Sequence, residues 1–251
     1  MYCGTSNVVL PVANKTQFPD AFKTASRLGY YATIFNSVEI NSTFYKLPMA
    51  RTPGKWAAET PPGFLFTAKL WKLVTHQKEL VFDEKDVRRF FEVCEGFGEK
   101  KGCLLLQLPA GAKAIYSDCF EPLLDTVAAL NSGWKLAVEF RDRDWYSDRI
   151  YNLLESYDCC LVEHDMPKSA TPAELPASDT RYMRFHGTDG KYRGSYTDEF
   201  LQQKAQEIRA TEQAGKKVFV YFNNTMGAAV FNAMKLENYY SSIASGNSSS
   251  K

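Results

Sequence analysis

The chain has 251 residues, of which 45% are hydrophobic and 24% charged, as is usual for a folded globular protein. Thirty Lys and Arg residues against 29 Asp and Glu residues give a formal net charge of +1. This balance argues against a broad surface for extended nucleic acid or acidic membranes, because such surfaces need clustered basic residues. The sequence shows no signal-peptide pattern and no apolar run of about 18 residues. We therefore expect a soluble cytoplasmic protein without a membrane partner.

Short β-type runs alternate with helical segments along the whole chain. The first strand, residues 2–4, precedes a helix over 20–28 that Gly29 would close. Further strands are expected at 37–41, 64–70, 103–108, 135–140, 159–163, 181–186 and 217–222. Further helices are expected at 51–60, 83–99, 117–130, 145–156, 197–214 and 225–236. Residues 167–177 contain three prolines and are expected to form a loop in place of a helix after the sixth strand.

Strict alternation of strands and helices predicts a parallel sheet. About eight such units in 251 residues favour a closed (β/α)8 TIM barrel over an open sheet. We expect one barrel domain over residues 1–240 and a flexible tail over 241–251.

The six cysteines include no CxxC pair, which excludes zinc-ribbon and thioredoxin-type sites. Cys159 and Cys160 are neighbours on an expected strand, so their side chains point to opposite faces and cannot easily pair. We expect reduced thiols and no structural disulfide.

The expected strands end in polar or charged residues that a buried hydrophobic strand does not need. Parallel barrels build their sites at these carboxyl ends, and residues two apart on a strand share a face. The polar set that would meet in the lumen comprises Glu39, Asn41, Lys69, Gln107, Glu139, Arg141, Glu163, Arg184, His186 and Asn223. We predict that Glu39, Lys69, Glu139, Arg184, His186 and Asn223 together line the largest polar cavity.

Structural roles compete with functional ones at several of these positions. Glu139 and Arg141 could form an ion pair that only holds the barrel, and Gln107 could terminate its strand by hydrogen bonding. His164 is expected in a structural or loop role, since its neighbours on the strand face the other way. His186 is a stronger candidate for a functional role. Gly187 permits close approach of the backbone to a ligand, and an imidazole is suited to acid–base catalysis.

Several segments together resemble the YecE-like family, a domain of unknown function (number 72). They are Glu39-Ile40-Asn41-Ser42-Thr43-Phe44-Tyr45, Lys69 with Thr75-His76, Leu106-Gln107-Leu108-Pro109, Val138-Glu139-Phe140-Arg141 with Trp145, Arg184-Phe185-His186-Gly187 and Tyr221-Phe222-Asn223-Asn224. The match runs almost the full length and implies a TIM barrel. It implies no particular reaction.

The leading hypothesis is an enzyme that acts on a polar, anionic small molecule by general acid–base chemistry, without a metal or other cofactor. The catalytic set would be Glu39, Glu139, His186 and Lys69, with a Glu as base and His186 as acid or electrophile. The substrate-binding set would be Asn41, Tyr45, His76, Gln107, Arg141, Arg184, Asn223 and Asn224. Phosphate or carboxylate groups suit the Arg and Lys side chains, and we expect an anion within hydrogen-bond reach of Arg184.

Two other classes of function compete with this hypothesis. Glu39, Glu139, Glu163 and His186 could hold a divalent metal in a hydrolase or isomerase. A binding protein for a ligand or a nucleic-acid end, without chemistry, would use aromatic side chains beside Arg for stacking.

Overall fold

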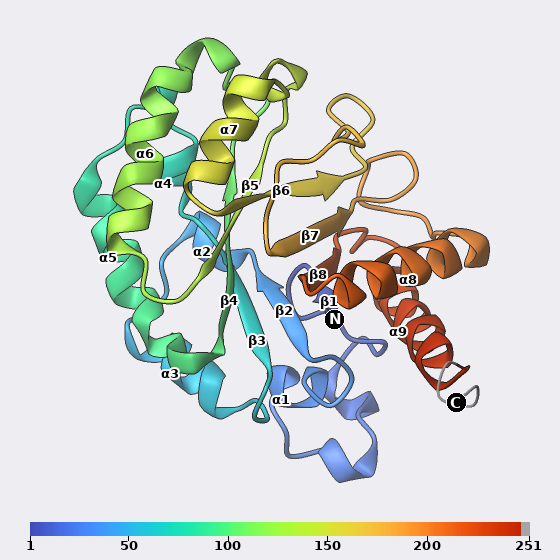
Figure 1. Ribbon diagram of the computed structural model, residues 1–251. Coiled ribbons are helices and arrows are strands. Elements are labelled where there is room, and N and C mark those ends of the chain that lie inside the picture. The colour runs from blue at the N-terminus through green and yellow to red at the C-terminus, as the bar shows by residue number, and fades with distance from the viewer. Residues whose placement is uncertain (247–251) are drawn as a thin grey trace.

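A computed structural model, which describes residues 1–246, shows a (β/α)8 barrel (Figure 1). Its strands are β1 (Tyr2–Thr5), β2 (Ser37–Ile40), β3 (Leu65–Lys69), β4 (Lys101–Gln107), β5 (Lys135–Glu139), β6 (Cys159–His164), β7 (Thr180–Phe185) and β8 (Lys217–Phe222). They form one eight-stranded sheet in the order β1-β8-β7-β6-β5-β4-β3-β2, and each paired neighbour is parallel. The predicted fold class is therefore confirmed.

The barrel closes between β1 and β2 through a short seam. Ser6 and Glu39 form an isolated parallel bridge, and the Asn7 N–H donates to the Glu39 carbonyl at 2.7 Å. A Cβ at Gly4 would lie 2.0 Å from the Ser37 carbonyl oxygen, so only glycine allows the two strands to approach this closely.

Helices surround the sheet on most of its circumference. Figure 1 shows α5 and α6 on one side of the barrel and the packed pair α8 and α9 on the other. The helices are α1 (Arg27–Tyr31), α2 (Ser42–Tyr45), α3 (Arg51–Ala58), α4 (Lys72–Thr75), α5 (Glu84–Cys94), α6 (Ser117–Leu130), α7 (Asp148–Ser156), α8 (Asp198–Gln213) and α9 (Ala229–Gly246). As predicted, β6 leads to β7 through a loop without a helix, which leaves a gap between α7 and α8.

Two expectations about the helices and the tail were wrong. The expected helix over 20–28 is a 3-10 turn, Asp20–Phe22, followed by α1. Gly29 does not end a helix but lies inside α1, and its N–H donates to the side chain of Ser26, the residue that caps the start of α1. Helix α9 continues to Gly246, so residues 241–246 are helical. The rest of the expected tail, 247–251, lies outside the described residues.

The lumen is filled beneath the site, so it is a core and not a pore. Its apolar layer comprises Cys103, Leu105, Ala137, Cys160, Val162, Tyr182, Phe219 and Tyr221. The Tyr221 hydroxyl pairs with Ser37 Oγ at 2.6 Å and with Thr67 Oγ1 at 2.8 Å, which satisfies the polar atoms buried with it. This packed layer supports the polar groups above it.

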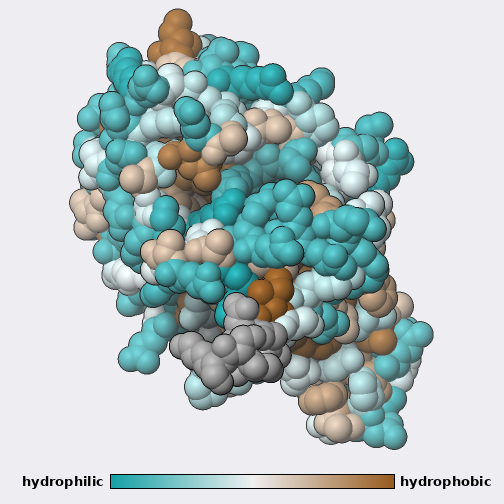
Figure 2. Space-filling view, turned by 45° about the vertical axis from the view of Figure 1, so that its right-hand side comes forward, coloured by the Kyte–Doolittle hydropathy of each residue, from teal (hydrophilic) through white to brown (hydrophobic). Residues whose placement is uncertain are grey.

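The outer surface is mixed in character. Figure 2 shows a mostly polar face on which hydrophobic residues occur in small groups. None of the described helices combines the length and the apolar character needed to cross a membrane. All six cysteines are free thiols, and five of them are buried.

Candidate active site at the carboxyl end of the barrel

A buried ion-pair network occupies the carboxyl end of the lumen. Arg184 on β7 donates from Nη2 to Glu39 Oε1 on β2 at 2.8 Å, and from Nη1 to Glu139 Oε2 on β5 at 2.5 Å. All three side chains are at most 1% exposed. The structure thus brings together the two carboxylates and the arginine that the strand ends predicted. The guanidinium lies between the carboxylates, so direct contact of Arg184 with an incoming anion is blocked in this arrangement.

Glu39 accepts hydrogen bonds from four side chains. Besides Arg184, its carboxylate accepts from Ser6 Oγ at 2.7 Å, from Asn41 Nδ2 at 3.1 Å and from the Tyr182 hydroxyl. Burial alone would raise the pKa of Glu39, but Arg184, Tyr182 and Ser6 outweigh it and hold the pKa below its usual range. A carboxylate with a lowered pKa that already accepts from four donors is a weak base.

Glu139 is held in the same way by two arginines. Its Oε1 forms an ion pair with Arg141 Nε, and its Oε2 accepts from Arg184. Burial opposes ionisation of Glu139, but the two guanidinium groups prevail and hold its pKa well below the ordinary value. The geometry therefore assigns Glu39 and Glu139 to holding the arginines, and the predicted role of either as general base is not supported by their surroundings.

His186 follows β7 directly and has both ring nitrogens engaged. Its Nδ1 lies 3.2 Å from Asp165 Oδ1, and its Nε2 lies 3.0 Å from Arg141 Nη2. Because a guanidinium can only donate, Nε2 must accept and Nδ1–H must donate to Asp165. Burial lowers the pKa of His186 to about 4, despite the opposing hydrogen bond to Asp165. The ring is therefore neutral near pH 7, with a lone pair on Nε2.

Asp165 is a functional candidate that the sequence reasoning did not assign. It follows β6, accepts from the His186 backbone N–H at 2.7 Å and accepts from the Tyr196 hydroxyl. The Tyr196 oxygen in turn accepts from the Gly187 N–H at 2.7 Å. The polar run Glu163-His164-Asp165 at the end of a strand could have indicated a role for Asp165. The orientation of a loop residue, however, does not follow from strand alternation.

A cavity of about 610 Å³ opens over this network, on the side of β4 to β7. Of the predicted residues, Gln107 and Arg141 line it directly, whereas Glu39, Glu139, Arg184 and His186 are buried outside its lining. Its charged lining residues are Arg141, Arg143, Lys168, Lys191, Asp142 and Asp189. The two acids are each neutralised, Asp142 by Lys113 and Asp189 by Arg193. The cavity therefore carries an excess of positive charge.

Lys69 and His76 form a second group of predicted residues, beside Gln107. Lys69 Nζ donates to Gln107 Oε1 at 2.7 Å and lies 4.0 Å from the centre of the Phe44 ring. His76 packs against the same ring at 4.7 Å, and its Nδ1 pairs with Thr75 Oγ1 at 2.9 Å. Phe44 thus places an amine and an imidazole in one group next to the cavity wall.

The remaining predicted residues lie outside the lining of the cavity. Tyr45 is 66% exposed, and Asn223 is half-buried, with its backbone N–H donating to the Phe185 carbonyl at 2.7 Å. Asn224 is fully buried and donates from Nδ2 to the Gly194 carbonyl and to Asn232 Oδ1, both at 3.0 Å. These bonds tie the loop after β8 to the loop after β7 and to α9, so Asn224 has a structural role between these segments.

The expected lumenal position of Glu163 was wrong, so Glu163 does not join Glu39, Glu139 and His186 in the alternative metal set. Cys160 and Val162 of β6 face the lumen, so His164 shares their face and Glu163 points outward to an ion pair with Arg181. His164 lies 5.8 Å from the His186 ring and its Nε2 donates to the Phe140 carbonyl at 2.8 Å. Among residues 1–246, no three His, Cys, Asp or Glu side chains are grouped as metal ligands would be.

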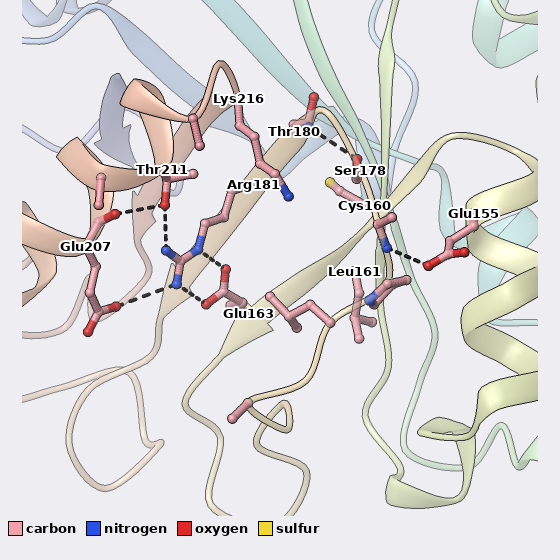
Figure 3. A pocket seen from close by; sticks show the side chains of 16 residues that line it. Glu155, Cys160, Leu161, Glu163, Ser178, Thr180, Arg181, Glu207, Thr211 and Lys216 are labelled. Atoms are coloured by element: carbon pink, nitrogen blue, oxygen red, sulfur yellow. Dashed lines mark hydrogen bonds and ion pairs between the residues drawn. The ribbon is translucent and has the colours of Figure 1, made fainter.

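The prediction that the site lies in the largest cavity was also wrong. A larger cavity, of about 730 Å³, lies outside the barrel in the gap between α7 and α8. Figure 3 shows that its central charge, Arg181, is already bound by Glu163, by Glu207 and by Thr211 Oγ1 at 2.9 Å. The gap exists because the β6–β7 connection supplies no helix. The described lining of this cavity carries three acids, Glu155, Glu163 and Glu207, against two bases, Arg181 and Lys216. It therefore offers no excess of positive charge to an anion, and we place the candidate site over the barrel instead.

Comparison with known proteins identifies relatives along the whole chain. The family described as "Protein of unknown function DUF72" matches residues 2–248. The UPF0759 protein YunF of Bacillus subtilis (strain 168) is 30% identical over 245 residues, covering 82% of this chain and 83% of its own length.

Solved structures of DUF72 family proteins show a similar fold. The protein from Thermotoga maritima MSB8 is 27% identical, with a TM-score of 0.75 over 94% of this chain and 97% of that chain. The protein from Enterococcus faecalis V583 is 19% identical, with a TM-score of 0.75 over 94% and 96% of the two chains. The second likeness concerns the fold alone.

Proposed function

Because the chain belongs to the DUF72 family, whose description states no activity, we propose a function from the geometry of the site. The protein is an enzyme that binds a small molecule carrying a phosphate or carboxylate group in the cavity over β4 to β7. It transfers protons to and from that molecule through His186. Fold alone supports no particular chemistry, so the argument rests on the cavity and its residues.

The observation that carries the proposal is the hydrogen bond between Arg141 Nη2 and His186 Nε2 at 3.0 Å. It joins the group best suited to bind an anion with the group best suited to accept a proton. Arg141 lines the cavity, and its side chain is 10% exposed. When the guanidinium turns to an anion, it withdraws from Nε2 and leaves that lone pair free.

Asp165 prepares His186 for this role. A carboxylate on Nδ1–H fixes the tautomer in which Nε2 is the acceptor, and stabilises the imidazolium that forms when Nε2 takes a proton. Withdrawal of the Arg141 charge and arrival of an anion both raise the pKa of His186 from about 4 toward the working pH. A base is most effective when its pKa lies near that pH.

Calorimetric titration with inorganic phosphate tests the proposal. Arg141→Met should weaken phosphate binding about ten- to hundredfold, since a charge-assisted hydrogen bond contributes about 1.5–3 kcal/mol. Arg149→Met is the matched control, because Arg149 on α7 is 69% exposed and pairs only with Asp118 at 2.6 Å among the described residues. The proposal fails if phosphate does not bind the wild type, or if both variants bind it equally well.

A binding role without chemistry is the second candidate, and the exposed ring of Tyr45 favours it. Tyr45 lies on α2, which follows β2 at the same end of the barrel, and an exposed aromatic side chain there can stack on a base while the cavity holds a terminal phosphate. Binding of a short 5′-phosphorylated oligonucleotide would then weaken steeply with salt and would depend on Tyr45. Equal affinity of Tyr45→Ala and the wild type would remove this candidate.

A further inference from the structure

Lys69 differs from the arginines of the site in its surroundings. Arg141 and Arg184 each contact a carboxylate, whereas Lys69 Nζ has no carboxylate within 4.0 Å among residues 1–246. Its partners are the neutral Gln107 oxygen at 2.7 Å and the face of Phe44 at 4.0 Å. The residue is 9% exposed, so it is largely removed from water but keeps some access to solvent. An amine in such surroundings loses its proton more readily than a surface lysine.

The electrostatics agree with this geometry. Burial, followed by the Arg184 charge, lowers the pKa of Lys69 from 10.5 to about 8. At pH 7 the neutral fraction of the amine is then roughly three-hundredfold larger than at the ordinary pKa. His76, on the same Phe44 ring, has its pKa lowered to about 4 by burial and by the charges of Lys69 and Arg141. A neutral imidazole and the amine therefore contact the same ring.

We propose that Lys69 is a nucleophile that forms an imine with an aldehyde or ketone group of the substrate. This inference rests on the proposed function and adds to it that the anionic substrate carries a carbonyl group. Gln107 lines the cavity and accepts from Lys69 Nζ, so the amine is one hydrogen bond from the cavity wall. Buried lysines with lowered pKa values serve this chemistry in other enzymes.

The steps balance without an oxidant or a cofactor. The amine lone pair adds to the carbonyl carbon, and the ammonium proton passes to the carbonyl oxygen, which gives a carbinolamine. Protonation of its hydroxyl releases water and leaves an iminium ion, and we assign these proton transfers to His76, which contacts the same Phe44 ring as the amine. The iminium nitrogen then draws electrons from an adjacent C–H bond, whose proton His186 Nε2 accepts. Return of a proton and addition of water release the product and the amine.

Reductive trapping tests the inference directly. The wild type is incubated with glyceraldehyde 3-phosphate, or with uncharged glyceraldehyde, in the presence of sodium cyanoborohydride, and labelled lysines are mapped by peptide mass spectrometry. At pH 7 we expect Lys69, whose lowered pKa leaves more of its amine neutral, to be labelled at least about tenfold faster than Lys78, whose side chain is 92% exposed. The rate at Lys69 should reach half its maximum near pH 8, and Lys69→Arg should abolish that adduct alone.

The paired probes separate this inference from the proposed function. Faster labelling by the phosphorylated probe, with the advantage lost in Arg141→Met, supports both. Equal labelling of Lys69 by both probes supports the imine and contradicts anion recognition. Labelling of Lys69 no faster than that of Lys78 with either probe overturns the imine, and phosphate calorimetry then still decides the proposed function.

Discussion

Replacing Arg184 with Met should destabilise the protein strongly and in a pH-dependent way. The variant keeps most of the side-chain volume but leaves Glu39 and Glu139 in a lumen where both are 0% exposed. Glu139 retains its ion pair with Arg141, whereas Glu39 retains only neutral donors. Removing one partner of a buried ion pair costs about 3–5 kcal/mol, a large share of a typical stability of about 5–15 kcal/mol.

The sign of the pH dependence follows from the two carboxylates. In the wild type their pKa values are lowered, so their contribution is fully present above the unfolded pKa near 4.3 and is lost as pH falls through the folded values. Without Arg184, burial raises the pKa of Glu39 above its unfolded value. The variant should therefore lose stability as pH rises from 5 to 8, while these groups leave the wild type unchanged over that range.

Urea unfolding at pH 5 and pH 8 measures both effects. The double variant Glu39→Gln, Arg184→Met is the control, because it removes one negative and one positive charge and leaves Glu139 paired with Arg141. It should recover a substantial part of the loss at pH 8 and show little pH dependence. The reasoning is refuted if Arg184→Met is as stable as the wild type at pH 8, or if its loss is the same at both pH values.

Two further substitutions test the surroundings of His186. Gly187→Ala should destabilise by at least about 1–3 kcal/mol in thermal or urea unfolding, because Gly187 has φ 92° and an added Cβ would lie 2.1 Å from the Arg193 carbonyl oxygen; unchanged stability would contradict the geometry. Tyr196→Phe should cost about 1–3 kcal/mol, since it removes a hydroxyl that joins Asp165 to the Gly187 N–H; a loss no larger than that of a surface Tyr→Phe variant would contradict that role.

The sequence was sufficient to predict the fold and the convergence of the lumenal charges. Alternation places Glu39, Glu139 and Arg184 on the face of their strands that also carries small or apolar lumen residues, and parallel strands bring their carboxyl ends to one face. The same rule failed at β6, because Glu163, His164 and Asp165 are all polar and their pattern does not reveal which parity faces inward. The inward positions of Cys160 and Val162 settle it.

The solvent access of the lumenal charged groups could not be predicted from strand alternation. Whether Arg184 meets a ligand or two carboxylates depends on the relative register of β2, β5 and β7, which three separate segments of sequence do not specify. The sequence also gave no sign that the β6–β7 loop would leave the larger cavity outside the barrel, although it did predict the loop itself.

The most direct test of the central claim is an NMR titration of the imidazole ring of His186 with and without phosphate. The chain has only three histidines, so His76→Gln and His164→Gln variants assign the signals. We predict that phosphate raises the pKa of His186 from about 4, because Arg141 leaves Nε2 to bind the anion, and that Arg141→Met removes this response. A pKa of His186 that phosphate does not change, or that responds equally in Arg141→Met, would contradict the claim that anion binding at Arg141 frees the base.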